Sequence, residues 1–459
     1  MVNDGSASPD RDYNGSEDAT GENNGKSFGV GRRNLLKAAG AGAFATGLAG
    51  CSGGGGGGGS GAEVPLADRD EVRVGVLAPV PTENPIGASI ANGVRLAAQE
   101  ITSGDTLGDT EVSVTVKDTK EQPQTGRTRY GELIRQENVD VTMGVFTSEV
   151  LLALMDDIAG SQTPHMTTGA ASPEASAQVN SNYEKYKYHF RTGPINAHHL
   201  GQNLVDFMDA KQSELGWESV AVLVEDYKWT EPVSDVLNDS LSDTGVDIAM
   251  NRRYPSGTED FNPIYNEVEN SGADAAFISM AHTGTAAVLQ WAQQQRPFEF
   301  GGIHVPMQLP SYYGAVKGAC AYGVTQNSAT PQAEVTSKTV PFSNAYNEEF
   351  GSYPVYTGYI SYDAMYQYAN VVANGGDLGG DAVVSGLEES SYTGTAGTIE
   401  YYGPDNEFAH DVKYDPELVW PIFQQWQPED PQNPQAGGTQ EVIFPDDLQT
   451  SEYQSPPWV

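Results

Sequence analysis

The chain has 459 residues, with 24 Lys and Arg against 62 Asp and Glu, which gives a formal net charge of −38 and a pI of about 4.3. This excess of negative charge excludes nucleic-acid binding through a basic surface. The 52 glycines, 38% apolar residues and 9% aromatic residues describe a folded protein with some flexible stretches. The length predicts two or three compact units.

The N-terminal segment carries the strongest short signal. Arg32 and Arg33 precede a mild apolar run, residues 38–50, which ends in Leu-Ala-Gly directly before Cys51. A membrane-spanning helix needs about 20 apolar residues, so this run of 13 residues is typical of a signal peptide instead. The pattern resembles a twin-arginine export signal closed by a lipobox, with Cys51 as the lipidated residue.

Residues 1–50 are therefore expected to be a twin-arginine lipoprotein signal, and residues 51–70 a Gly/Ser-rich tether. The alternative is a short buried helix beside a chance arginine pair. A flexible Gly/Ser stretch directly after Cys51 favours the lipid anchor. The second cysteine, Cys320, lies far away in an apolar stretch, which excludes a disulfide framework and a cysteine-based zinc site.

Almost all of the charge remains after this segment. Five Lys/Arg and six Asp/Glu fall within residues 1–50, so residues 51–459 keep 19 basic and 56 acidic residues. Such a surface repels itself at low salt and is tolerated near 1 M salt, where the Debye length falls to about 3 Å. The composition is typical of a protein from a salt-loving organism, of haloarchaeal type; the alternative is an acidic face for a partner.

The body of the chain alternates short β-branched runs with amphipathic helical patterns. This rhythm predicts parallel βαβ units and an α/β fold. A first block of strands is expected at 72–77, 112–117, 139–145, 164–168 and 188–192, with helices at 90–101, 126–137, 149–159 and 196–209. A second block repeats the scheme, with strands at 219–224, 246–250, 274–280 and 301–305 and helices at 231–242, 260–270 and 284–294. After residue 320 we expect a strand at 321–326, helices at 341–350 and 360–373, and a β-rich piece around 397–426.

Two similar blocks indicate two lobes joined by a hinge, each a doubly wound parallel sheet. Ligands of such sheets bind beyond the carboxyl ends of the strands, where helix N-termini present free N–H groups. We expect lobe 1 to comprise residues 71–193 and 322–392, lobe 2 residues 194–321 and 393–426, and a C-terminal tail residues 427–459.

Sequence signatures of catalysis or metal binding were not found. The adjacent His198 and His199 point about 100° apart on a helix and cannot share a metal, and no His-Glu-x-x-His spacing occurs. Two Gly-x-Ser-x-Gly matches, at residues 25–29 and 50–54, do not follow a strand. We therefore expect no enzyme activity, no cofactor and no metal.

Several segments, in this order, resemble the type I solute-binding proteins of ABC transporters, and most closely the branched-chain amino acid (Leu/Ile/Val-binding) family. The resemblance covers roughly residues 71–426. Its motifs are 74–77 with Gly87, 143–148, 168–174, 190–192, 260–261 and 362–364.

The resemblance implies where a ligand binds. The family's carboxylate site matches Thr147, Ser148, Gly169, Ala170 and Ala171. Ser148 also suits the N-cap of the following helix, and capping alone is the competing interpretation.

In the second lobe, the family's aromatic residue matches Trp229, with Tyr227 close by. An aromatic lid removes apolar ligand surface from water, whereas the alternative is a Trp packed in the lobe core. Tyr359, near the hinge in the family, is a weaker candidate.

The chain departs from the family at two places. Ile86 or a neighbour stands where the family has an aromatic residue in the first loop, and the acid that holds the ligand ammonium after strand 274–280 is absent. Glu225 or Asp226 could replace that acid. Otherwise the ligand is a carboxylate, an amide or another small polar solute, with His282 as a donor; a plain surface role for His282 is the alternative.

The resemblance implies a monomeric, lipid-anchored binding protein on the outer face of the cell membrane. It would capture a small polar solute, such as an amino acid, amide or related carboxylate, and deliver it to an ABC permease. The alternatives are a ligand sensor of the same fold that signals to a membrane receptor, and an exported hydrolase.

Overall fold

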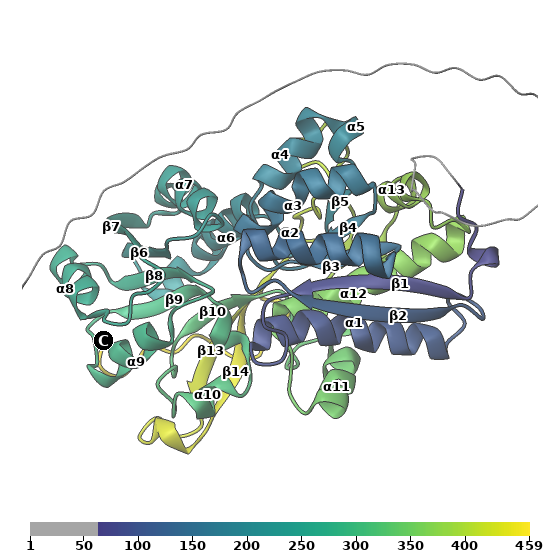
Figure 1. Ribbon diagram of the computed structural model, residues 1–459. Helices are drawn as coiled ribbons and strands as arrows, with labels where there is room; N and C mark the ends of the chain where they lie inside the picture. Colours follow the sequence, from purple (N-terminus) through teal and green to yellow (C-terminus); the bar gives the residue numbers. More distant parts are fainter. Residues whose placement is uncertain (1–62) are drawn as a thin grey trace, which may run out of the picture. The chain divides into compact units, whose positions relative to one another are not determined.

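The computed structural model describes residues 63–459, which form an α/β unit built around two β-sheets (Figure 1). This confirms the predicted fold class of two lobes with parallel sheets. Arg32, Arg33, Cys51 and most of the tether lie outside the described residues. Within residues 63–459, no helix combines the length and the apolar character that crossing a membrane requires.

The first sheet is entirely parallel, with the strand order β2-β1-β3-β4-β5. In β1, Val72, Val74 and Val76 are fully buried, as expected for a strand with helices on both sides of its sheet. The strands are β1 (Glu71–Ala78), β2 (Glu111–Asp118), β3 (Val141–Gly144), β4 (His165–Thr167) and β5 (His189–Arg191).

Helices α1 and α12 pack closely together beside this sheet (Figure 1). Asn84 caps α1 by accepting a hydrogen bond from the Ile86 N–H, and Pro85 occupies the first turn. Gly93 allows the close approach, since a Cβ there would lie 2.4 Å from the Gly358 carbonyl oxygen. The helices of this lobe are α1 (Pro85–Ser103), α2 (Pro123–Glu132, continued by a π turn at Leu133–Glu137), α3 (Ser148–Ser161), α4 (Glu174–Ser181), α5 (Tyr183–Tyr186), α11 (Thr339–Phe350), α12 (Tyr356–Gly375) and α13 (Gly380–Glu388).

The second sheet has the order β14-β13-β10-β9-β8-β6-β7. Strands β10, β9, β8, β6 and β7 run parallel, and β13 and β14 add an antiparallel edge. The strands are β6 (Ser219–Glu225), β7 (Asp247–Tyr254), β8 (Ala275–Met280), β9 (Glu299–His304), β10 (Val324–Asn327), β13 (Ile422–Pro428) and β14 (Gly438–Phe444). The helices are α6 (Ala197–Leu215), α7 (Thr230–Ser240), α8 (Asn262–Ser271), α9 (Thr285–Gln293) and α10 (Tyr312–Ala315).

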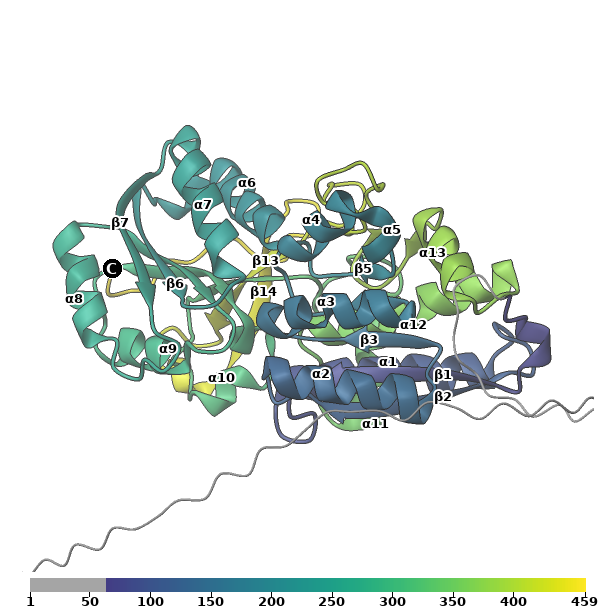
Figure 2. The same cartoon turned by 45° about the horizontal axis from the view of Figure 1, so that its top comes forward.

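Two expected boundaries differ from the structure. Residues 324–327, expected in lobe 1, form β10, which pairs with β9 and β13 in the second sheet. Residues 427–459, expected to be a tail, complete β13 and form β14, whose Val442 and Ile443 are buried. The Pro, Gln and Gly-rich stretch is the connection of this antiparallel pair, so its polar composition marks a turn within the sheet (Figure 2).

The chain passes between the two sheets three times: after β5, after β10, and after a small hairpin of β11 (Tyr392–Thr393) and β12 (Thr398–Ile399). These crossings bring the carboxyl ends of β3 and β4 near those of β6, β8 and β9. Apart from the two boundaries corrected above, the assignment of residues to lobe 1 and lobe 2 stays a prediction.

Candidate functional site

A pocket lies between the two sheets, at the carboxyl ends of strands from both. It encloses about 450 Å³ of space that protein atoms do not fill, part of it open to solvent. Its lining is mainly apolar, and it contains no Asp, Glu, Lys or Arg side chain. The lining residues are Phe146, Gly169, Ala171, Pro194, Leu200, Trp229, Ala281, His282, Ile303, Val305, Gln308, Gln326, Ser328 and Tyr356.

The backbone is strained where the first sheet reaches this pocket. Val145 has φ 65°, an unfavourable conformation for a β-branched residue, directly after β3. Two hydrogen bonds hold it there: its N–H donates to the Leu77 carbonyl at 2.8 Å, and its carbonyl accepts from the Ala170 N–H at 2.9 Å. The turn carries the chain so that Phe146 lines the pocket, and strain of this kind is found preferentially at functional sites.

The start of α3 differs from the expected cap. Thr147 occupies the N-cap position, and Ser148 is the first residue of the helix. The Ser148 hydroxyl accepts a 3.0 Å hydrogen bond from the Ser172 N–H, while the buried Thr147 hydroxyl has no partner among the described residues. Ser148 therefore ties α3 to the loop after β4 and does not cap its own helix through its side chain.

Hydrogen bonds from Arg191 hold the loop after β4, residues 168–173, in place. The fully buried guanidinium donates to the carbonyls of Ala170 and Ser172, the latter at 2.6 Å, and pairs with Asp411 at 2.9 Å. Asp411 also accepts from the Asn196 amide at 2.9 Å. This buried network fixes the loop that contributes Gly169 and Ala171 to the pocket.

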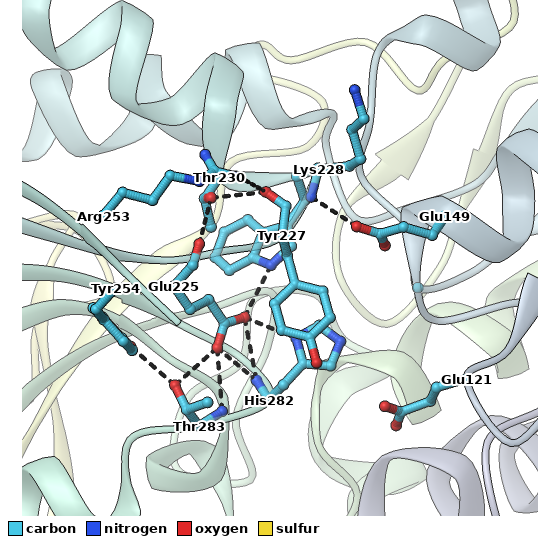
Figure 3. A network of polar contacts seen from close by, with 12 residues as sticks. Glu121, Glu149, Glu225, Tyr227, Lys228, Thr230, Arg253, Tyr254, His282 and Thr283 are labelled. Carbon is cyan, nitrogen blue, oxygen red and sulfur yellow. Dashed lines mark hydrogen bonds and ion pairs between the residues drawn. The ribbon is translucent and has the colours of Figure 1, made fainter. Parts of the chain in front are cut away.

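On the second lobe, the fully buried carboxylate of Glu225 ends β6 and accepts several hydrogen bonds (Figure 3). One oxygen accepts from the Trp229 indole N–H at 3.0 Å and faces the His282 Nδ1 at 2.7 Å. The other accepts from the His282 N–H at 3.0 Å and from the Thr283 N–H and hydroxyl at 3.1 and 3.0 Å. Burial alone would raise the pKa of the Glu225 carboxyl, but the interactions with His282 and these N–H groups outweigh it, and the pKa is lowered.

The imidazole of His282 contacts two aromatic rings. Tyr227 stacks on it with a centroid distance of 3.7 Å and an interplanar angle of 9° (Figure 3). Phe146 of the first lobe lies at a centroid distance of 4.7 Å and an angle of 44°. The His282 side chain is 7% exposed, so a plain surface role is wrong. Its Nε2 is buried and has no partner among the described residues, and His282 lines the pocket.

Trp229 follows β6 and is buried, with its indole N–H directed to Glu225. It packs within the apolar core, as the alternative held, and also lines the pocket; its role as an aromatic lid over a ligand stays a prediction.

Lys228 connects the two lobes at this site. Its main-chain N–H donates to the Glu149 carboxylate of α3 at 2.9 Å, and its ammonium lies 3.5 Å from the Glu174 carboxylate of α4 (Figure 3).

Four of the ten sequence-predicted ligand-binding residues line the pocket: Gly169, Ala171, Trp229 and His282. Tyr227 contacts it indirectly by stacking on His282, and Thr147, Ser148 and Ala170 adjoin the lining residues in the chain. Ile86 is buried and its carbonyl accepts from the Thr357 hydroxyl. Tyr359 packs in a separate cluster with Phe342 and bonds to Ser343, so the structure does not bring it to the pocket.

Sequence reasoning missed the part of the lining that comes from the crossing segments. Gln326 is the last residue of the strand predicted at 321–326, whereas Gln308, Ser328 and Tyr356 lie outside the predicted strands and helices and follow no periodic pattern. Tyr356 donates to the Gly169 carbonyl at 2.9 Å, which joins the start of α12 to the pocket loop. Within residues 63–459, no group of three or more His, Cys, Asp or Glu could hold a metal ion. What the arrangement can do is enclose a small solute and hydrogen-bond to it.

Comparison with known proteins agrees with this architecture. A family model for periplasmic binding proteins matches residues 71–414. Leu/Ile/Val-binding protein homolog 8 of Brucella abortus is 24% identical over 323 residues, which cover 65% of this chain and 76% of that protein.

Solved structures show the same fold. A solute binding protein of an ABC transporter from Rhodopseudomonas palustris, in complex with 3,4-dihydroxybenzoic acid, superimposes with a TM-score of 0.67 at 18% identity and covers 84% of this chain and 99% of its own. A branched-chain amino acid transporter substrate binding protein from Streptococcus pneumoniae, in complex with isoleucine, gives a TM-score of 0.66 at 15% identity, covering 82% and 100%.

Proposed function

The chain belongs to the periplasmic binding protein family, and from this premise we propose that it is the solute-binding component of an ABC importer. It would capture a small solute between its two lobes and present it to a permease. The observation that carries the proposal is the pocket between the sheets, lined by strand ends of both lobes and bridged by Lys228. A pocket shared by two lobes couples ligand contacts to lobe closure, because only the closed state offers both sets of contacts.

The chemistry of the solute is narrowed by the pocket lining. The aromatic and aliphatic lining suits a solute with an apolar body, and the few polar groups suit one or two hydrogen-bonding ends. Among the relatives, the two complexes above hold an aromatic acid and isoleucine, both small carboxylates with apolar bodies. We propose a compact amino acid, amide or related carboxylate for this chain.

The first test is a thermal-shift screen of such solutes in molar salt. A true ligand stabilises the folded state by an amount that grows with the logarithm of its concentration above Kd, and it is recovered unchanged from the protein. Recovery of a chemically altered solute would instead support the exported hydrolase. Ser148→Ala and Trp229→Ala should weaken binding without unfolding the protein; unchanged affinity by calorimetry in both variants would contradict this site.

Membrane anchoring is a separate part of the proposal. The twin-arginine pair and Cys51, in their sequence context, support export as a lipoprotein of haloarchaeal type, with the lobes displayed outside the membrane. Cys51→Ser should release the protein from the membrane fraction into the medium, whereas Cys320→Ser, at the buried free cysteine, serves as the control. Release of both variants, or of neither, would contradict lipidation at Cys51.

A further inference from the structure

One polar atom in the pocket stands apart from the others. Of the pocket-lining residues, His282 is the one that carries a buried side-chain nitrogen or oxygen without a hydrogen-bond partner, and that atom is Nε2. Leaving a buried polar atom unpaired costs free energy. A solute that pairs with Nε2 would recover this free energy, so His282 is the strongest polar determinant of which solute is retained.

The surroundings fix which proton the ring carries. The Nδ1 lies 2.7 Å from the Glu225 carboxylate, which accepts from its other neighbours and has no proton of its own to offer. Nδ1 therefore carries the proton and donates it. A second proton on Nε2 would have no hydrogen-bond acceptor among the described residues. In the Nδ1–H tautomer, Nε2 carries a free lone pair and can accept a hydrogen bond.

The ring cannot turn away from this role. The ring stacks on Tyr227 and contacts Phe146, and the two Glu225 oxygens accept hydrogen bonds from the main chain and the ring of His282. Because the ring is already fixed in the ligand-free protein, Nε2 favours solutes whose donor lies in the matching position.

The same geometry disfavours a free ammonium group. Two carboxylates lie near His282 (Figure 3): Glu225, whose oxygens already accept from Trp229, His282 and Thr283, and Glu121, which is not part of the pocket lining. The lining itself has no carboxylate, and Gln308 is engaged at both ends, by the Gln326 carbonyl at 3.0 Å and the Tyr356 N–H at 3.3 Å. A buried ammonium would have to give up water without gaining a carboxylate of the lining as its partner.

We propose that His282 is the specificity-determining acceptor of this pocket, and that the solute offers it an uncharged hydrogen-bond donor, a hydroxyl or an amide N–H, where an amino acid carries its ammonium. This rests on the proposed function, because it assumes that a solute occupies the pocket. The class of solute is a compact, apolar-bodied hydroxy acid or carboxamide.

The test compares three probes that share one skeleton and differ in a single group. Leucine, 2-hydroxy-4-methylpentanoate and 4-methylpentanoate carry an ammonium, a hydroxyl and no donor at the same carbon. By calorimetry we expect the hydroxy acid to bind about tenfold or more tightly than 4-methylpentanoate, and more tightly than leucine. Tightest binding of leucine would uphold the solute-binding function and overturn this inference.

A matched variant separates the acceptor from the packing of the ring. His282→Phe keeps a flat ring beside Tyr227 and Phe146 and removes Nε2, so the ratio of the affinities for the hydroxy acid and for 4-methylpentanoate should fall to about one, whatever the variant does to each affinity alone. The same preference in wild type and His282→Phe would overturn the role of His282.

A second measurement needs no ligand. Long-range ¹H–¹⁵N correlation spectra of the ligand-free protein at neutral pH should show His282 protonated at Nδ1 and bare at Nε2, and a Glu225→Gln variant should lose the pure Nδ1–H form. A proton on Nε2 of the wild-type ring would overturn the inference.

Discussion

The main-chain N–H of Lys228 donates a 2.9 Å hydrogen bond to the carboxylate of Glu149, and this bond joins the loop after β6 to the first turn of α3. The two residues belong to different lobes (Figure 3), and Lys228 directly precedes Trp229, which lines the pocket. The second carboxylate oxygen of Glu149 is buried and unpaired among the described residues. Because this bond links the two lobes, its loss lowers the stability of the closed state relative to the open state.

Glu149→Ala should therefore lower ligand affinity about five- to tenfold, because the closed state loses one hydrogen bond to a charged group. The apparent unfolding temperature without ligand should change little, since the bond lies at the edge of the unit. Calorimetry and thermal unfolding of the same samples separate the two effects. Lys228→Ala is the control: it keeps the main-chain N–H and removes the half-exposed ammonium near Glu174, so it should affect affinity less. A larger loss in Lys228→Ala would contradict the main-chain bond as the coupling contact.

The buried pair of Arg191 and Asp411 predicts a much larger effect on stability. Both side chains are fully buried, and Asp411→Ala would leave the guanidinium without its counter-charge. We expect a loss of about 3–5 kcal/mol in the free energy of unfolding, measured with denaturant in molar salt. Asp157→Ala removes an exposed pair with Arg127 and should leave stability near the wild-type value. Similar losses of unfolding free energy in the two variants would show that burial of the ion pair does not determine the size of the loss.

Buried histidines make the stability depend on pH. Burial lowers the pKa of His165 to about 3 and that of His304 to about 4, against an ordinary value near 6.5. Between these values the unfolded chain binds more protons than the folded protein, so stability is full above about pH 6.5 and falls as the pH is lowered. Each such histidine contributes a slope of up to about 1.4 kcal/mol per pH unit.

A variant tests this linkage directly. His165→Gln should flatten the dependence of the unfolding free energy on pH between about 6.5 and 4, whatever it does to the absolute stability. His198→Gln, at an exposed position in the first turn of α6, should leave the slope as in wild type. An unchanged slope in His165→Gln would mean that the His165 ring takes up a proton in the folded state.

The sequence predicts most of the strands and helices of this protein but only part of its site. The alternation of strands and helices predicts the parallel βαβ units. The turn after β3 places Thr147 and Ser148 at the edge of the pocket. Short helices such as α4 and α13 were missed because their 8 and 9 residues give too few turns for a clear period.

The remaining errors have a common physical cause: contacts between distant segments. Glu225 and His282 are 57 positions apart, and their hydrogen bond depends on β6 and β8 being neighbours in the sheet. Tyr359 resembled a site residue by its place in the chain, yet it lies on the side of α12 that packs against Phe342, whereas Tyr356, three residues earlier, faces the pocket. No local pattern distinguishes these two tyrosines.

The acidic surface predicts that folding depends on salt. With 56 acidic and 19 basic residues after position 50, like charges repel across the surface, and raising salt from about 0.1 to 1 M shortens the screening length from about 10 to 3 Å. We expect the unfolding temperature to rise steeply with KCl.

A triple variant on and after α7 tests charge repulsion as the cause. Asp235, Asp239 and Asp243 are exposed and form no ion pair among the described residues. Asp239 also lies in the last turn of the helix, where a negative charge is unfavourable. The triple Asn variant should be more stable than wild type at low salt and nearly equal to it at 3 M KCl. Equal stabilisation at both salt concentrations would point to helix propensity or packing and against charge repulsion as the cause.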